Sequence, residues 1–395
     1  MKTNYQILIV GGGTAGIMVS AQLKRKRPAL SIAIIEPSET HYYQPAFTLV
    51  GAGTYAMGKT IRKEASVIPA GVDWIKDRVT KVSPDSNEVI TAKNGTIRYD
   101  YLVLAPGLVY DLSLIEGLSE ALDKGIVCSN YIDPEHTWKL LQAFKGGNAI
   151  FTQPATPIKC GGAPQKAMYL AADYLRQKGL ADKTNIVFAT PGTVIFGVKT
   201  IADTLMKVIN RYNVDLRLFH TPVKIDAARK LVYFRDTTPP DKPQPPDIIK
   251  GSTVTAEGLI EVPFDFLHLA PPQAAPGFIR DSGLSNSGGW LDVDNNSLQH
   301  KTYSNIFGLG DVAALPTAKT GAAIRKQAPV VVDNLLKLLN GSPADNISYE
   351  GYSSCPLVTG YGKMVLAEFN YNNEFTPDPM LRYLLISNSD KEHWR

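Results

Sequence analysis

The sequence predicts an α/β protein built on parallel strands that are connected by helices. Three segments near the N-terminus carry this prediction. Residues 5–10 form a short apolar run of β-branched character, and residues 14–27 have the apolar periodicity of a helix. A second apolar run at 31–35 completes a strand-helix-strand unit of about 30 residues, which is the usual length of a βαβ unit. Such a unit begins a parallel sheet.

Similar alternation continues along the chain. We expect strands at 72–76, 87–91, 97–104, 148–153, 185–189, 214–219, 231–235, 264–269 and 304–309, and helices at 133–145, 164–178, 199–212 and 321–339. Residues 237–247 contain five prolines and should form a surface loop or semi-rigid spacer. The pattern predicts a first, split dinucleotide domain from 1–110 and 265–340, an inserted second α/β domain at 111–264, and a C-terminal region at 341–395.

Composition excludes several classes of protein. The 395 residues are 44% hydrophobic and 20% charged, with 41 Lys and Arg against 37 Asp and Glu, so the balance has no nucleic-acid footprint. Three cysteines without a Cys-x-x-Cys pair, and six histidines without metal-ligand spacing, predict neither a disulfide scaffold nor a metal site. No apolar run approaches the about 18–20 residues of a membrane span, and residues 1–10 have the pattern of a strand rather than a signal peptide.

A glycine-rich turn between the first strand and helix predicts a dinucleotide site. Gly11, Gly13 and Gly16 match Gly-x-Gly-x-x-Gly, in which the glycines permit a tight turn, close approach of a pyrophosphate, and close packing of helix on strand. The helix N-terminus offers free amides to the phosphates. Glu36, at the end of the second strand, is placed to accept hydrogen bonds from a ribose. The alternative is a glycine turn with no ligand.

A second motif indicates which dinucleotide is bound. Residues 305–311, NIFGLGD, form a short strand that ends in Gly310 and Asp311. This resembles the motif with which FAD enzymes of the two-dinucleotide-domain type hold the ribityl chain, so we expect FAD rather than NAD. Residues 100–107 resemble the intermediate strand of the same superfamily, with Pro106 where threonine is common. A helix-capping role for Asp311 is the alternative.

The second domain lacks the corresponding fingerprint. The strand at 148–152 is followed by a segment in which Pro154, Pro157 and Pro164 stand where turn glycines would, and prolines remove amide donors that a pyrophosphate needs. We therefore predict that NADH is not the electron donor.

Two cysteines lie in settings that suit redox chemistry. Cys160 precedes a predicted helix and is flanked by Lys159 and Lys166, and both features favour a thiolate. Cys355 lies in a segment, 352–361, that we expect to be turn-rich. Composition alone favours the alternative of two buried structural cysteines. Cys128 is predicted to be non-essential.

Five segments resemble sulfide:quinone oxidoreductases, specifically the branch that includes the mitochondrial enzyme. The resemblance runs from residue 5 to about 371, and the two cysteine segments are its most specific parts. It implies two Rossmann-like domains of the flavoprotein disulfide reductase type plus a small C-terminal region. The segments are 41–45 with 48–53, 157–166, 268–272, 309–320 and 352–361.

The resemblance makes Cys160 and Cys355 a redox-active pair beside FAD. It implies that sulfide attacks the sulfur bridge between them, which leaves a persulfide on Cys355 and a flavin-facing thiolate on Cys160. Lys319 would stabilise negative charge on the reduced flavin; a solvated surface lysine is its alternative. The implied cofactor-binding residues are Gly11, Gly13, Thr14, Ala15, Gly16, Glu36, Gln44, Val79, Gly310, Asp311, Lys319 and Thr320.

The resemblance also implies partners and a location. Sulfide and quinone are the substrates, and sulfite, glutathione, coenzyme A or polysulfide would take the sulfane sulfur. Monotopic contact with a membrane surface predicts a protein peripheral to the bacterial cytoplasmic membrane, and residues 379–395 resemble the approach to an amphipathic segment. Tyr361 and Phe369 are candidates for the quinone pocket or for the core. A homo-oligomer, an NADH:quinone oxidoreductase of the same fold and a non-catalytic flavin-binding protein remain alternatives.

Overall fold

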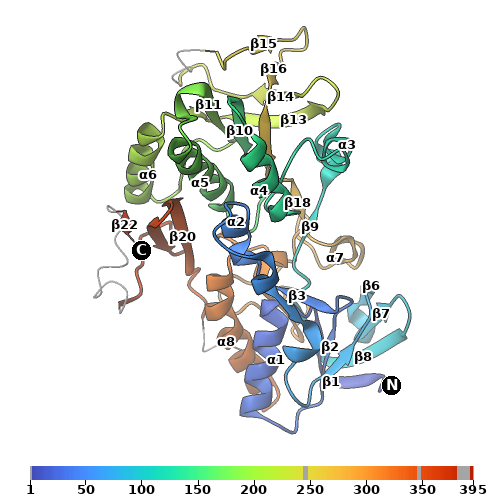
Figure 1. Cartoon of the computed structure of the whole chain (residues 1–395). Helices are drawn as coiled ribbons and strands as arrows, with labels where there is room; N and C mark the ends of the chain where they lie inside the picture. Colours follow the sequence, from blue (N-terminus) through green and yellow to red (C-terminus); the bar gives the residue numbers. More distant parts are fainter. Residues whose placement is uncertain (1, 243–247, 345–347, 380–391, 395) are drawn as a thin grey trace.

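The computed structural model describes residues 2–242, 248–344, 348–379 and 392–394, and it confirms the α/β class (Figure 1). Its first sheet has the strand order β5-β2-β1-β8-β7-β6, with β19 also paired to β8. The central strands β5, β2, β1, β8 and β19 pair in parallel, and β7 and β6 extend the sheet in antiparallel fashion. The strands are β1 (Asn4–Val10), β2 (Ile32–Ile35), β5 (Asp73–Ile75), β6 (Val79–Ser83), β7 (Glu88–Thr91), β8 (Gly95–Leu104) and β19 (Ile306–Gly308).

The first strand is continuously apolar because both faces of this sheet are covered. Ile7 and Ile9 of β1 point into a core formed with α1 (Thr14–Lys26) and α8 (Gly321–Leu338). Leu8 and Val10 alternate into a second core on the other face. Figure 1 shows α1 and α8 side by side, as their packing contacts require. Burial on both faces therefore explains the apolar run that predicted a parallel strand.

A second, four-stranded parallel sheet has the order β12-β11-β10-β17 and lies in the other half of the molecule (Figure 1). The fourth strand, β17, comes from a part of the chain far downstream of β10 and pairs with it in parallel. Its strands are β10 (Gly147–Thr152), β11 (Thr184–Ala189), β12 (Asp215–Arg217) and β17 (Phe266–Leu269); the helices α4 (Pro134–Ala143), α5 (Ala163–Gln177) and α6 (Lys199–Arg211) contribute to the core on one face.

Two smaller sheets complete the positioning of the site. An antiparallel sheet of β13 (His220–Asp226), β14 (Leu231–Asp236), β16 (Ile260–Pro263) and β15 (Thr253–Val254) packs behind the second parallel sheet. Near the C-terminus, β20 (Ser353–Gly360) and β21 (Lys363–Phe369) form a hairpin, to which β22 (His393–Trp394) adds. The hairpin packs against α5, which brings residues about 190 positions apart in sequence into one region.

The predicted elements are confirmed with small shifts of their ends, but one local prediction is wrong. Cys355 lies inside strand β20, not in a turn-rich segment. The described part of the proline-rich stretch, 237–242, lies outside helices and strands as predicted. Most of the segment 379–395 falls outside the described residues. Within the described ranges, no helix combines the length and apolarity that crossing a membrane requires.

Candidate active site

The glycine turn after β1 has the geometry that a bound dinucleotide needs. Gly11 has φ +105°, and a Cβ there would lie 2.2 Å from the carbonyl oxygen of Ala105. A Cβ on Gly16 would lie 2.0 Å from the carbonyl oxygen of Gly11, so helix and turn are in direct contact. Gly13 is exposed, and a Cβ there would meet nothing within 4 Å. The turn is thus tight at Gly11 and Gly16 and open to a ligand at Gly13.

The start of α1 is also free to receive an anion. Gly13 is its N-cap, no side chain caps it, and its first turn holds no acidic residue. Glu36, just past the end of β2, accepts hydrogen bonds from the Gly12 amide at 2.8 Å and from the Ser38 amide at 2.7 Å. Uncapped amides at the start of the helix suit the pyrophosphate of a dinucleotide, and the neighbouring carboxylate at the end of the strand suits its ribose. The residues present therefore fit an FAD-type dinucleotide.

The second predicted motif lies next to this turn. Gly310 has φ +75°, and a Cβ there would lie 3.5 Å from Cβ of Ala15, the second residue of α1. Desolvation raises the pKa of Asp311, and the charges of Lys159 and Lys319 partly offset that effect. The N-cap of α8 is Thr320, whose side chain accepts from the Ala323 amide at 3.1 Å. Asp311 itself lies inside a 3-10 helix (η7, Gly310–Val312) whose N-cap is Leu309, so it is the N-cap of neither helix and the helix-capping alternative is wrong.

Lys319 is a buried residue and not the solvated surface lysine of the alternative hypothesis. It is 9% exposed, its Nζ donates to the carbonyl oxygen of Ala313 at 2.7 Å, and it lies 4.1 Å from the ring centroid of Trp290. Burial lowers its pKa to about 8, against the opposing charge of Asp311. A cation held in this way is available to balance a developing negative charge nearby.

The remaining predicted cofactor residues are placed as follows. Thr14 is exposed and begins α1, and Val79 is buried at the start of β6. The side chain of Gln44 accepts a hydrogen bond from Lys159 Nζ at 2.6 Å. The hydroxyl of Thr320 also lies 2.8 Å from that of Ser353, so α8 is tied to the strand that carries Cys355. The cofactor contacts of these residues stay predictions.

The structure brings Cys160 and Cys355 together. Cys355 points inward from β20 and is 3% exposed, whereas Cys160 lies in the loop before α5. Their Sγ atoms are 3.9 Å apart, and both are free thiols. Cys160 has φ +50°, a left-handed conformation that is rare outside glycine, and its amide donates to the carbonyl oxygen of Lys319 at 2.7 Å. Two cysteines 195 residues apart thus form a contacting pair, one of them on a strained backbone.

The charges around the pair favour a thiolate on Cys160. The thiol of Cys355 donates to Cys160, and Lys166 Nζ lies 3.4 Å from Cys160 Sγ; these contacts lower the pKa of Cys160 although burial opposes them. The same hydrogen bond, together with burial, raises the pKa of Cys355. Burial opposes the charge of Lys166, but the adjacent cysteines outweigh it and its pKa is raised. The pair therefore divides into a thiolate and a neutral thiol.

Of the two lysines that flank Cys160 in sequence, only Lys166 contacts its sulfur in this way. Lys166 is in the first turn of α5 and is 5% exposed. Lys159 extends instead to Gln44 and lies 5.1 Å from the ring centroid of Tyr110. The prediction that both lysines stabilise the thiolate is correct for Lys166 and is not supported by a contact for Lys159.

Sequence reasoning missed Tyr131 as part of the site. Its hydroxyl lies 3.1 Å from the carbonyl oxygen of Lys159 and 3.3 Å from that of Cys160, and donates toward both. Burial raises the pKa of Tyr131 well above its ordinary value, so it stays a hydrogen-bond donor. These bonds fix the loop that holds Cys160. No signal marked Tyr131 in the sequence, because it lies 29 residues away.

The segment between β10 and α5 is organised around Cys160 rather than around a phosphate. β10 ends at Thr152 and α5 begins at Ala163, with a proline in its first turn. The Ala163 amide donates to the carbonyl oxygen of Cys160 at 2.7 Å. The connection, residues 153–162, is far longer than the tight turn after β1, and we call it the redox loop because it holds Cys160. This loop occupies the start of α5. This geometry agrees with the predicted lack of an NADH fingerprint.

Cys128 and His268 form a neighbouring structural pair. Cys128 is fully buried and donates to the carbonyl oxygen of Leu267 at 3.4 Å, and burial raises its pKa to about 12. His268 accepts from the Asn130 amide at 3.0 Å, and burial lowers its pKa to about 4. A neutral thiol and a neutral imidazole on adjacent backbone segments have a packing role.

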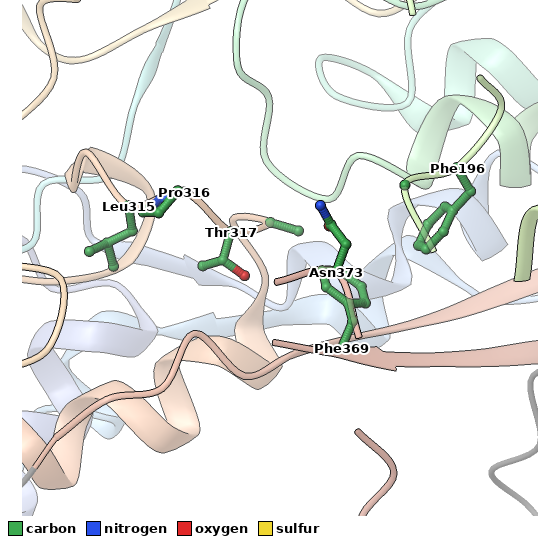
Figure 2. Close-up of a pocket in the computed structure, with 8 residues that line it drawn as sticks. Phe196, Leu315, Pro316, Thr317, Phe369 and Asn373 are labelled. Carbon is green, nitrogen blue, oxygen red and sulfur yellow. The ribbon is translucent and has the colours of Figure 1, made fainter. Parts of the chain in front are cut away.

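Two adjoining cavities lie near the site, and only the second of them is lined by residues of the loop before α5. The first, of about 350 Å³, includes Phe196, Thr317, Phe369 and Asn373 in its lining (Figure 2). The second, of about 340 Å³, shares Thr317 with the first and extends to Gly161 and Lys319. Phe369 thus faces hollow space near the redox loop. Tyr361 is held elsewhere: its hydroxyl donates to the carbonyl oxygen of Ala52 at 2.7 Å.

Comparison with known proteins identifies the family. The sequence profile of the pyridine nucleotide-disulphide oxidoreductases matches residues 5–330. The mitochondrial sulfide:quinone oxidoreductase of Mus musculus is 42% identical over 372 residues, which cover 94% of this chain and 79% of that protein. This chain belongs to the sulfide:quinone oxidoreductase family. The mitochondrial sulfide:quinone oxidoreductase of Dictyostelium discoideum is 40% identical and covers 95% of this chain and 79% of that protein.

A solved structure shares the fold. The sulfide:quinone oxidoreductase of Aquifex aeolicus aligns with a TM-score of 0.76 at 22% identity, over 94% of this chain and 84% of that one. The resemblance drawn from the motifs is therefore confirmed at the level of the family and the fold. Sulfide:quinone oxidoreductases are flavoproteins, and the glycine turn described above fits such a cofactor.

Proposed function

We propose that this protein oxidises sulfide to sulfane sulfur through Cys160 and Cys355 and passes the electrons through FAD to a quinone. The single observation that supports this most strongly is the contact between the two cysteines beside the buried cation of Lys166. Membership in the sulfide:quinone oxidoreductase family supplies the substrates. The glycine turn, Glu36 and Asp311 would hold the FAD.

The chemistry begins from the oxidised pair. Hydrosulfide attacks Sγ of Cys355, a sulfur–sulfur bond forms to it, and the Cys160–Cys355 bond breaks with its electron pair on Cys160. Cys355 then carries a persulfide and Cys160 a thiolate. Lys166 stabilises the leaving thiolate, because its ammonium group lies 3.4 Å from Cys160 Sγ. A leaving thiolate of lowered pKa speeds this exchange.

The turnover closes when a small acceptor removes the terminal sulfur from Cys355 and the two cysteines rejoin. The electron pair released as the cysteines rejoin needs a two-electron acceptor, and FAD held by the glycine turn, Glu36 and Asp311 would supply that redox chemistry between the cysteines and the quinone. Sulfite, glutathione, coenzyme A or polysulfide would serve as acceptor. Because quinones partition into the bilayer, we propose peripheral contact with a membrane surface, which would be the bacterial cytoplasmic membrane if the protein is bacterial.

The competing function is NADH:quinone oxidation on the same fold. The proposed function predicts quinone reduction by purified holoprotein with sulfide as donor and none with NADH, because the loop before α5 holds Cys160 where a nucleotide turn would lie. A short-chain quinone and each donor in turn, followed by quinone absorbance, make the test. Turnover with NADH and none with sulfide would overturn the proposal.

A further inference from the structure

A buried carboxyl group, Glu64, lies beside the glycine turn that follows β1. It begins a short 3-10 helix (η3, Glu64–Ser66) after β4 (Ile61–Lys63), and it is 1% exposed. Its backbone amide donates to the carbonyl oxygen of Glu39 at 2.9 Å, which fixes it against the residue just before β3 (Thr40–Tyr42). Among the described residues, no group forms a hydrogen bond with its Oε1 atom. A buried carboxyl oxygen without a partner is costly, and it is therefore a candidate for a ligand contact.

The orphaned oxygen points at the glycine turn. A Cβ on Gly12 would lie 2.6 Å from Glu64 Oε1 and 2.7 Å from Cγ of Glu36. Glu36 is already bonded to the Gly12 amide. Two carboxyl groups from separate segments therefore flank the second glycine of the turn, on the side where the ribose of a dinucleotide is bound.

Two titratable side chains face Glu64. His41 Nδ1 lies 3.4 Å from Oε2, and the negative charge of Glu36 lies across Gly12. Burial and, secondarily, Glu36 raise the pKa of Glu64 to about 7. Below about pH 7, Glu64 is therefore mainly protonated and can donate a hydrogen bond. Glu36 needs no such proton to accept hydrogen bonds from ribose hydroxyls.

We propose that Glu64 is a second cofactor-binding carboxyl, which in its neutral form donates a hydrogen bond to the ribose-pyrophosphate part of the bound dinucleotide. The inference rests on the proposed binding of FAD but not on the sulfide chemistry. A neutral acid gains a bond to the ligand, whereas an ionised one faces the pyrophosphate charge as well as Glu36. Glu64 therefore couples FAD retention to pH.

The sign of the coupling follows from linkage. Because FAD favours the protonated acid, the pKa of Glu64 is higher with FAD bound than without it. Affinity is then constant below about pH 7 and weakens as pH rises through the interval between the two pKa values, by up to about tenfold per pH unit for one linked proton. Glu64→Gln stays neutral at every pH and keeps a donor, so its affinity should not follow this dependence.

The test is equilibrium release of FAD from holoprotein, measured by flavin fluorescence on dilution between about pH 6 and pH 9. Wild type should release FAD more readily as the pH rises above about 7, and Glu64→Gln should remain near the low-pH value throughout. His41→Gln separates the histidine's own titration, and Glu120→Gln, an exposed residue paired with Lys124, is the matched control. Both should retain the wild-type slope.

Either of two results would overturn the inference. One is a flat pH profile in wild type; the other is a pH slope that persists in Glu64→Gln. If Glu64 only supports the local fold, Glu64→Gln changes the unfolding temperature and leaves the slope in place. None of these measurements involves sulfide or the cysteines, so their failure is distinguishable from failure of the proposed function.

Discussion

Two adjacent glycines beside the redox pair differ in the space around them. A Cβ on Gly162 would lie 2.9 Å from Cys355 Sγ and 2.4 Å from Cδ2 of Leu357, whereas a Cβ on Gly161 would meet nothing within 4 Å. Gly162→Ala should therefore displace Cys355 and reduce sulfide-dependent quinone reduction by about tenfold or more, since small misplacements of reacting groups are costly. Gly161→Ala is the matched control, and equal losses in the two variants would contradict this account of the pair.

Lys166 should set the fraction of Cys160 that is a thiolate. Lys166→Met removes the cation 3.4 Å from Cys160 Sγ, and we expect the pKa of Cys160 to rise by about 1 to 3 pH units. The rate of thiol alkylation against pH, in a Cys355→Ser background, measures it. Lys199→Met, at an exposed residue paired with Asp203, should leave the profile unchanged. An unshifted pH profile of alkylation in Lys166→Met would show that Lys166 does not stabilise the thiolate of Cys160.

At the scale of single residues, the sequence indicated which residue types lie at the site but not which of them contact one another. It placed Lys159 and Lys166 on either side of Cys160, and only the first turn of α5 decides which of them reaches the sulfur. Glu64 and Tyr131 carried no signal, because each acts through a neighbour that is distant in sequence. The residues that flank Cys160 indicated its redox role. They did not indicate its left-handed backbone, because cysteine rarely adopts that conformation.

Two glycines of the turn between β1 and α1 should have different roles, Gly11 in the stability of the fold and Gly13 in the binding of FAD. Gly11→Ala puts a Cβ 2.2 Å from the Ala105 carbonyl at φ +105°, so it should lower the unfolding temperature of the protein. Gly13→Ala meets no protein atom within 4 Å, so it should leave stability of the FAD-free protein intact and weaken FAD binding. Thermal unfolding and FAD content of both variants make the comparison. If Gly13→Ala retains FAD as wild type does, the pyrophosphate does not lie against this turn.

Strands were predictable from the sequence where both of their faces are buried. β1, β2 and β10 are covered on both faces, so their apolar runs are unambiguous. β20 was missed because its inward positions are Ser353, Cys355, Leu357 and Thr359, only one of which is strongly apolar, and because Pro356 suggests a turn. That proline is tolerated because β20 lies at the edge of its sheet, where among the described strands it pairs with β21 alone.

At the scale of the whole molecule, the site is assembled where separate parts of the chain meet. Cys160 comes from the loop before α5, Cys355 from the C-terminal hairpin, and Lys319 from the segment before α8. Asp173 of α5 accepts from the Tyr361 amide at 2.8 Å, which joins the helix to the turn of the hairpin. The family and the α/β fold class were predictable from motifs. The pairing of Cys160 with Cys355 was implied by the resemblance, but the residues alone did not predict it, because no local pattern specifies how the hairpin docks on α5.

The central claim is that Cys160 and Cys355 transfer electrons from sulfide to FAD. Anaerobic titration of the holoprotein with sulfide, followed by flavin absorbance, tests it most directly, with Cys160→Ser and Cys355→Ser as variants and Cys128→Ser as the matched control. We predict stoichiometric bleaching of the flavin in wild type and Cys128→Ser, and none in the other two variants. Flavin that sulfide leaves oxidised in wild type, or bleaching that survives in Cys160→Ser and Cys355→Ser, would contradict the claim.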